Sequence, residues 1–286
     1  MIPSTFAYDR AESVAEAIEK LQSAGGDGKL LAGGHSLLPL MKLRLTSPSK
    51  LIDIGRIAEL HGIAQVGDAI AIGALTTHAA VASSTLVKEK LPVLAQAASQ
   101  IGDIQVRNRG TVGGNLAHAD MASDLPAVAL ALDVEFAVAT PDGNEVIGVE
   151  DFFIGPMVTA LPEYSMVTNV KFKLPPAGAM QVYEKVPHPA SGYAVVGVAA
   201  VVAVGADQTV NYVRIGMTGA ADVAYRAKAV EDALMGHAFT EAAIDEAAKL
   251  AAVDGSIAGD LYASEEYRRN LCVVHTARAL KRLLNA

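Results

Sequence analysis

Apolar and polar positions in the first part of the chain follow the spacing of a helix flanked by short strands. Three apolar residues recur on one face of a helix predicted over residues 12–23, namely Val14, Ile18 and Leu21. Short apolar runs predict two buried strands, at residues 29–32 and 51–54. The first of these strands leads straight into Gly33-Gly34, so a glycine-rich segment follows it directly.

The middle of the chain alternates between hairpin-like and helical patterns. Gly67-Asp68 and the turn at residues 141–144 each separate two apolar runs, which is the arrangement of a β-hairpin. Pro126 lies in the first turn of an expected helix, where its missing N–H removes no hydrogen bond. The elements predicted here are hairpins over 63–72 and 134–149, helices over 86–100 and 124–132, and an extended strand over 166–174.

Pro175-Pro176 is the strongest candidate for a domain boundary, because consecutive prolines halt a strand and are typical of linkers. Beyond it, three apolar strand-like runs precede three helical patterns. Strands followed by helices indicate an α+β unit. The strands are predicted over residues 180–186, 193–204 and 209–217, and the helices over 225–235, 241–252 and 264–284.

Composition narrows the classes of protein that fit. The 286 residues are 51% hydrophobic, which is enough for one large core or several smaller ones. A formal net charge of -8 argues against nucleic-acid binding, because phosphate contacts need clustered Lys and Arg. The sequence contains no uninterrupted apolar run of about 18 residues, so no membrane span is predicted. It does not open with a basic region followed by an apolar run, as a secretory signal would, so a cytoplasmic location is expected. Cys272, the one cysteine, can form neither an internal disulfide nor an iron–sulfur site. We expect it to be a small buried hydrophobe in a helix.

Two glycine-rich segments are the candidate sites of chemistry. Residues 32–36 read Ala-Gly-Gly-His-Ser, and residues 111–115 read Thr-Val-Gly-Gly-Asn. Paired glycines let backbone amides approach an anion closely, and Ser36 and Thr111 add hydroxyl donors. Neither segment has the spacing of a dinucleotide fingerprint or a P-loop. Two interpretations stay open on these residues alone: plain turns, or two loops that grip the ends of one diphosphate.

The two segments, in this order and spacing, resemble those of the FAD-binding medium subunits of the xanthine dehydrogenase family. The resemblance rests on residues 31–42, on residues 110–115 and on the downstream step 123–126. It extends from the start, Met1-Ile2-Pro3, to residues 266–269 near the end. Within the family, the chain is most similar to the branch of aerobic molybdenum–copper carbon monoxide dehydrogenases.

The resemblance implies an α+β fold in two parts. A two-part FAD-binding domain of the PCMH, or vanillyl-alcohol-oxidase-like, type is expected over residues 1–175, with subdomains of about 1–56 and 57–175. An α+β C-terminal domain with a three-stranded antiparallel sheet and helices is expected over residues 176–286.

The resemblance also implies which residues bind a non-covalent FAD. The amides of residues 32–36 would wrap the pyrophosphate, with Thr111 and Gly114-Asn115 on its other side. Asp124 would contact ribityl or ribose hydroxyls. Lys185 and Tyr193 would lie where the C-terminal domain covers the isoalloxazine ring. The alternative for Lys185 is a surface charge, and the alternative for Tyr193 is an ordinary core residue of a strand. The expected FAD contacts are Leu31, Ala32, Gly33, Gly34, His35, Ser36, Leu37, Gly110, Thr111, Gly113, Gly114, Asn115, Asp124, Lys185 and Tyr193, and no catalytic or metal-binding residue is expected.

The family implies an electron relay rather than a site of substrate oxidation. A large subunit would hold a molybdenum-cytosine-dinucleotide cofactor with copper, where carbon monoxide and water become carbon dioxide. Two-iron two-sulfur clusters in a small subunit would pass the electrons to the FAD of this chain. The expected assembly is a dimer of heterotrimers. A quinone is the favoured acceptor, which would bring the complex to the inner face of the membrane.

Two alternatives remain open from the sequence. The same subunit would serve equally in a purine, N-heterocycle or aldehyde dehydrogenase, because the large subunit selects the substrate. A module that binds no flavin is the alternative from another class.

Overall fold

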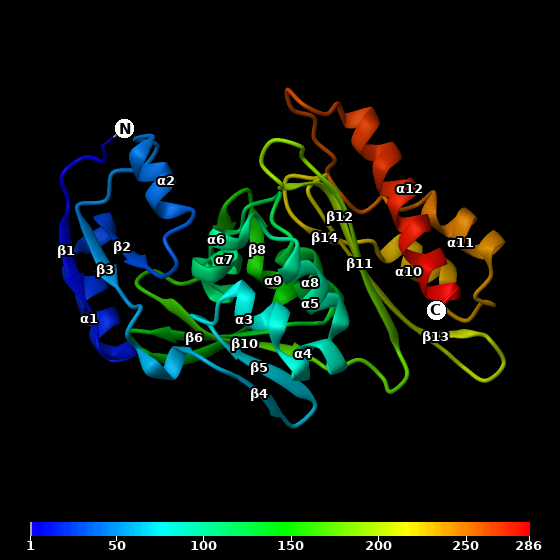
Figure 1. Cartoon of the computed structure of the whole chain (residues 1–286), viewed down its shortest axis with the longest axis horizontal. Helices are drawn as coiled ribbons and strands as arrows, with labels where there is room; N and C mark the ends of the chain where they lie inside the picture. Colours follow the sequence, from blue (N-terminus) through cyan, green and yellow to red (C-terminus); the bar gives the residue numbers. More distant parts are fainter. Residues whose placement is uncertain (1) are drawn as a thin grey trace.

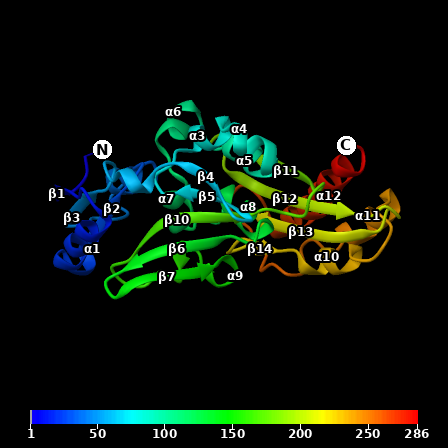
Figure 2. The same ribbon diagram turned by 90° about the horizontal axis from the view of Figure 1, so that it is seen from below.

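The computed structural model describes residues 2–286; Met1, where the family resemblance starts, lies outside the described residues. The chain forms three larger sheets that follow one another in a row, each with its own helices (Figures 1 and 2). A two-stranded hairpin of β8 (Phe153–Gly155) and β9 (Val158–Thr159) is a fourth, minor sheet.

The first sheet is parallel and has the strand order β1-β3-β2. Helix α1 packs on it through Ile18 and Leu21, which the helical spacing had placed on one face. Ser13 begins this helix by accepting a hydrogen bond from the amide of Glu16, which a helix start would otherwise leave unpaired. The elements are β1 (Ala7–Arg10), α1 (Val14–Ser23), the 3-10 helix η1 (Gly25–Asp27), β2 (Gly28–Leu31), α2 (Leu37–Lys42), β3 (Lys50–Asp53) and η2 (Ala58–Leu60).

The second sheet is antiparallel, and the long strand β10 is its centre. The order is β4-β5-β10-β6-β7, so each of the two predicted hairpins adds to one side of β10. This arrangement confirms both hairpins and the extended strand expected before the two prolines. The strands are β4 (Ile63–Val66), β5 (Ala69–Gly73), β6 (Glu135–Thr140), β7 (Gly143–Gly148) and β10 (Met166–Lys173).

Short helices between β5 and β6 cover one face of the second sheet (Figure 2). The single helix predicted over residues 86–100 is wrong, because the structure has two, α4 and α5. Pro92 lacks an N–H, and Leu91 before it leaves the helical region with φ −134° and ψ 61°. The helices are α3 (His78–Ser83), α4 (Thr85–Lys90), α5 (Pro92–Ser99), α6 (Ile104–Arg109), α7 (Val112–His118) and α8 (Leu125–Ala131), with α9 (Val149–Phe152) after β7.

The third sheet has the order β11-β12-β13-β14 and carries helices on both faces. Its three long strands are those predicted, and the two-residue β14 takes residues that the sequence placed in the next helix. Strand β12 is buried along nearly its whole length, because α12 packs on it from one side and α8 from the other. The elements are β11 (Met180–Pro187), β12 (Ala194–Val204), β13 (Val210–Thr218), β14 (Tyr225–Arg226), α10 (Lys228–Leu234), α11 (Glu241–Ala248) and α12 (Glu265–Leu284).

Helix α8 joins the second and third units through close backbone packing. A Cβ on Gly216 of β13 would lie only 1.9 Å from the carbonyl oxygen of Ala127 in α8. Only glycine therefore allows this approach. Within residues 2–286, no helix is both long and apolar enough to cross a membrane.

Cys272 is fully buried in α12, as its apolar neighbours had indicated. Burial raises the pKa of its thiol to about 11, so very little thiolate forms near pH 8. We expect a disulfide reagent such as DTNB to leave the native chain unlabelled and to label one thiol per chain in guanidinium. Comparable labelling rates in the native and unfolded protein would contradict this burial.

Candidate cofactor site

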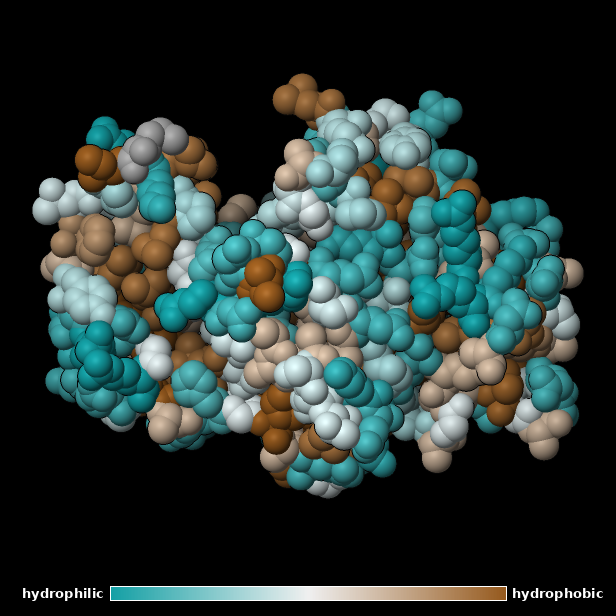
Figure 3. All heavy atoms as spheres, viewed as in Figure 1, coloured by the Kyte–Doolittle hydropathy of each residue, from teal (hydrophilic) through white to brown (hydrophobic). Residues whose placement is uncertain are grey.

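A cavity of about 770 Å³ lies where the three units meet. Its wall includes β2 and the glycine-rich segment after it, the start of α7, residues 161–167, and residues 191–193 before β12. Figure 3 shows the molecule hollowed along the edge between the N-terminal unit and the remainder. The volume falls in the range of about 300–1,000 Å³ that is typical of small-molecule and cofactor sites.

The segment between β2 and α2 presents a run of backbone amides at this cavity. Gly34 has φ +73°, a conformation that glycine adopts without steric cost. In the described part of the chain, the amides of residues 33–37 donate no hydrogen bond to any other group. The ring of His35 folds back, with Nδ1 2.9 Å from the carbonyl oxygen of Gly33. Successive unpaired amides form a concavity that binds anions.

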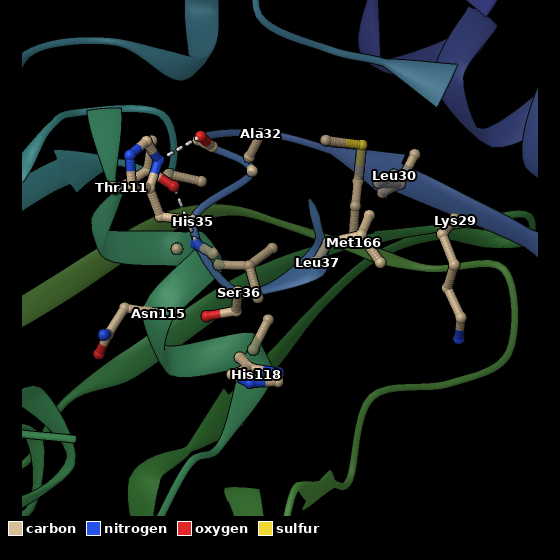
Figure 4. Close-up of a pocket in the computed structure, with 18 of the residues that line it drawn as sticks. Lys29, Leu30, Ala32, His35, Ser36, Leu37, Thr111, Asn115, His118 and Met166 are labelled. Carbon is tan, nitrogen blue, oxygen red and sulfur yellow. Dashed lines mark hydrogen bonds between the residues drawn. The ribbon is translucent and has the colours of Figure 1, made fainter. Parts of the chain in front are cut away.

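The second glycine-rich segment is the start of helix α7, where a loop had been expected. Thr111 caps the helix, and its hydroxyl accepts a hydrogen bond from Gly114 (Figure 4). The first three amides of the helix are already occupied: Val112 donates to Thr76, Gly113 to Ala74 and Gly114 to Thr111. This segment therefore offers the cavity side chains rather than free amides. Asn115 is one of them, and its Oδ1 accepts a hydrogen bond from Ser123 at 2.7 Å.

The two glycine-rich segments lie in direct backbone contact. A Cβ on Gly33 would lie 2.2 Å from the carbonyl oxygen of Arg109 and 2.9 Å from the Cα of Gly110. A Cβ on Gly113 would lie 2.5 Å from that of Ala74. These glycines are thus required first by the packing of one wall segment on its neighbour, before any ligand enters.

Asp124 and Lys185 form a buried ion pair between the second and third units. The Lys185 Nζ lies 2.9 Å from Oδ1 of Asp124, and the two side chains are 2% and 5% exposed. The hydroxyl of Tyr183 also donates to Asp124, and Lys185 donates to the carbonyl of Gln100. Burial raises the pKa of the Asp124 carboxyl, against the lowering effect of Lys185 and Tyr183. Burial, together with the charge of Asp124, raises the pKa of Tyr183.

Two of the expected FAD contacts, Lys185 and Leu31, are absent from the cavity wall. Lys185 does not line the cavity, because its ammonium group is held by Asp124 and Gln100 in the interior; nor is it a surface charge. Leu31 lies in β2 and is also not part of the cavity wall. The remaining expected contacts all line the cavity, including Asp124 and the 44% exposed Tyr193.

Two histidines of the wall, His78 and His118, were not among the FAD contacts expected from the sequence. His118 ends helix α7. It lies three residues after Asn115 in α7, and its side chain lies on the same side as those of Asn115 and Ser36 (Figure 4). The three-residue spacing would have paired it with Asn115, had this segment been recognised as a helix. His78, at the start of α3, also lines the cavity.

Two family models match the chain. Residues 4–175 match the FAD binding domain in molybdopterin dehydrogenase. Residues 181–283 match the CO dehydrogenase flavoprotein C-terminal domain.

Relatives match over the full length. The carbon monoxide dehydrogenase medium chain of Hydrogenophaga pseudoflava is 40% identical over 286 residues, which cover 100% of this chain and 98% of that protein. A 6-hydroxypseudooxynicotine dehydrogenase subunit of Paenarthrobacter nicotinovorans is 33% identical and covers 100% and 96%. Among solved structures, the Hydrogenophaga pseudoflava carbon monoxide dehydrogenase superposes with a TM-score of 0.96 at 41% identity, covering 100% of this chain and 99% of that chain. Quinoline 2-oxidoreductase of Pseudomonas putida superposes with a TM-score of 0.93 at 28% sequence identity, covering 100% of this chain and 99% of that chain.

Proposed function

Because this chain belongs to the FAD-binding flavoprotein family of the molybdopterin dehydrogenases, we propose that it is the medium subunit of an aerobic carbon monoxide dehydrogenase. Its task is to hold FAD and relay electrons, an oxidoreductase role without substrate chemistry of its own. The observation that carries this proposal is the run of unpaired amides at residues 33–37, which opens into a cavity of cofactor size.

The residues of the wall suit the parts of a dinucleotide. The amides of residues 33–37 would hold the pyrophosphate, with the hydroxyl groups of Ser36 and Thr111 as further donors. The side-chain amide of Asn115 and the carboxylate of Asp124 would contact hydroxyl groups of the ribityl or ribose units. Tyr193, whose pKa is raised by burial, would cover the isoalloxazine ring. The bound FAD supplies the redox chemistry, accepting electrons from one centre and releasing them to the next.

The ion pair of Lys185 with Asp124 determines what charge this part of the protein presents to the ring. Lys185 would not act as a free cation beside the flavin, because Asp124 neutralises it within the protein interior. The pair would instead hold β11 and the start of α8 in position, and with them the wall that encloses the ring.

The remaining parts of the proposal concern the assembly. We place the boundary between the two domains of this chain at residues 175/176. Its proposed partners are a large molybdenum–copper subunit and a small iron–sulfur subunit, and the proposed assembly is a dimer of heterotrimers. A quinone at the inner face of the membrane is the proposed acceptor, with the complex in the cytoplasm. Carbon monoxide is favoured by the 40% identity to the carbon monoxide dehydrogenase medium chain of Hydrogenophaga pseudoflava, which exceeds the 36% identity to the nicotine 6-hydroxylase medium subunit of Paenarthrobacter nicotinovorans.

The experiment that tests this function is flavin retention and turnover. The chain is purified alone and as a complex with the large and small subunits, and its visible spectrum is recorded. We expect a flavin band near ~450 nm in the complex and carbon monoxide oxidation with an artificial dye. Absence of FAD from both preparations contradicts the flavin role. A flavin-bearing complex that oxidises an N-heterocycle but not carbon monoxide contradicts only the substrate.

A further inference from the structure

His78 lies at the junction of the two glycine-rich segments. Its side chain is 2% exposed and yet lines the cavity. A Cβ on Gly110 would lie 2.8 Å from Cδ2 and 2.9 Å from Nε2 of the His78 ring, so this edge of the ring faces Gly110. Gly110 in turn abuts Gly33, where the run of unpaired amides begins. The ring edge therefore lies beside the proposed anion site.

The backbone around His78 holds the ring in this place. Thr77 caps helix α3 by accepting a hydrogen bond from the amide of Ala80 at 3.2 Å. The amide of His78 donates to the carbonyl of Gly110 at 3.0 Å. The backbone of His78 is thereby tied to that of Gly110, which fixes the position from which the imidazole extends.

The two ring nitrogens of His78 have different surroundings. Nδ1 is buried and has no hydrogen-bond partner among the described residues, whereas Nε2 is not sealed in this way and belongs to the edge that faces Gly110. Burial lowers the pKa of the imidazole to about 4, with His35 acting in the same direction, so the ring is neutral near pH 7. A neutral imidazole carries one N–H. A buried N–H without an acceptor is costly, which favours the proton on Nε2.

We propose that His78 is a further FAD-binding residue, and that its neutral Nε2–H donates a hydrogen bond to a pyrophosphate oxygen. The inference rests on the proposed function, since the acceptor is the dinucleotide. The amides of residues 33–37 bind the negatively charged pyrophosphate, and the His78 ring contacts it from the side of Gly110. A neutral donor adds direction to the binding without adding a second charge to the site.

Three substitutions in the assembled complex test this role. The complex is stripped of flavin and titrated with FAD, and binding is followed by the quenching of flavin fluorescence. His78→Phe fills the space without a donor, His78→Gln places an amide near the position of Nε2, and His78→Asn places one near Nδ1. A hydrogen bond to a charged group predicts an FAD affinity at least about tenfold weaker for Phe and Asn. Gln is expected to stay within about threefold of the unsubstituted protein.

The control and the decisive comparison separate this role from a structural one. His237→Phe alters an exposed histidine of the third unit that does not line the cavity, and it should bind FAD normally. Thermal unfolding of each flavin-free variant is recorded. If the Phe variant fails to fold, the Gln and Asn pair decides: tighter binding by Gln supports the proposal, and equal or reversed affinities overturn it. An unsubstituted complex that binds no FAD overturns the proposed function and this inference together.

Discussion

The substitution Gly33→Ala is expected to weaken FAD binding by about 10- to 100-fold. The added carbon would lie 2.2 Å from the carbonyl oxygen of Arg109, so the two glycine-rich segments would have to separate. Overpacking of this kind costs about 1–3 kcal/mol. Each 1.4 kcal/mol that falls on the bound conformation lowers affinity about tenfold. Flavin content per purified complex and an FAD titration measure the effect.

Gly148→Ala is the matched control for this substitution. A Cβ there meets no atom within 4 Å, and the position has no positive φ. We therefore expect unchanged flavin content and an unfolding free energy within about 1 kcal/mol of the original. If Gly33→Ala retains a full complement of FAD with unaltered affinity, the contact between the two segments does not shape the site.

Loss of the Lys185 ammonium, which is paired with Asp124 in the interior beside the cavity, should strongly destabilise the fold. Lys185→Met leaves the carboxylate of Asp124 buried, and among the described residues only Tyr183 remains as its side-chain partner. Removing one member of a buried pair costs about 3–5 kcal/mol, because an uncompensated charge stays in the interior. Urea unfolding of the flavin-free chain measures the loss. The exposed pair of Lys249 with Glu246 is the control, and Lys249→Met should cost about 0–1 kcal/mol.

The cost of Lys185→Met should depend on pH in a defined direction. Burial raises the pKa of Asp124, and removal of the lysine takes away the largest opposing effect. The folded variant then binds its proton more tightly than the unfolded chain, whose carboxyl has a pKa of 3.8. The deficit is therefore smallest below that value and grows as the pH rises through the folded pKa. An equal deficit at pH 5 and pH 8 would show that Asp124 is not a buried, unpaired acid in the variant.

Local rules account for much of what the sequence predicted. Hairpin turns such as Gly67-Asp68 act over a few residues, so the strands beside them were placed within one or two positions. The failures were also local in origin. Pro92 breaks a helix that apolar spacing alone had made continuous. Thr111 caps the start of helix α7, whereas the paired glycines Gly113 and Gly114 had indicated a loop.

Contacts between distant elements lay outside the reach of such rules. Tyr183 and Lys185 are two residues apart on β11, so both point to one face of the sheet. Which acid that face meets depends on the packing of β11 beside the start of α8, about 60 residues earlier in the chain. No pattern within either segment specifies this partner. The pairing of Lys185 with Asp124 could not be predicted from the sequence for this reason.

The sequence by itself determined the elements, the α+β class, and the two glycine-rich segments that mark the family. These depend on the periodicity, turn chemistry and residue order of short stretches. Only the tertiary structure decided which amides remain free, because an amide is unpaired or occupied according to what packs against it. Within residues 2–286, the amides of residues 33–37 donate no hydrogen bond, whereas those of residues 112–114 donate to other groups of the chain. The cavity, the buried pair of Asp124 with Lys185 and the position of His78 all follow from that packing.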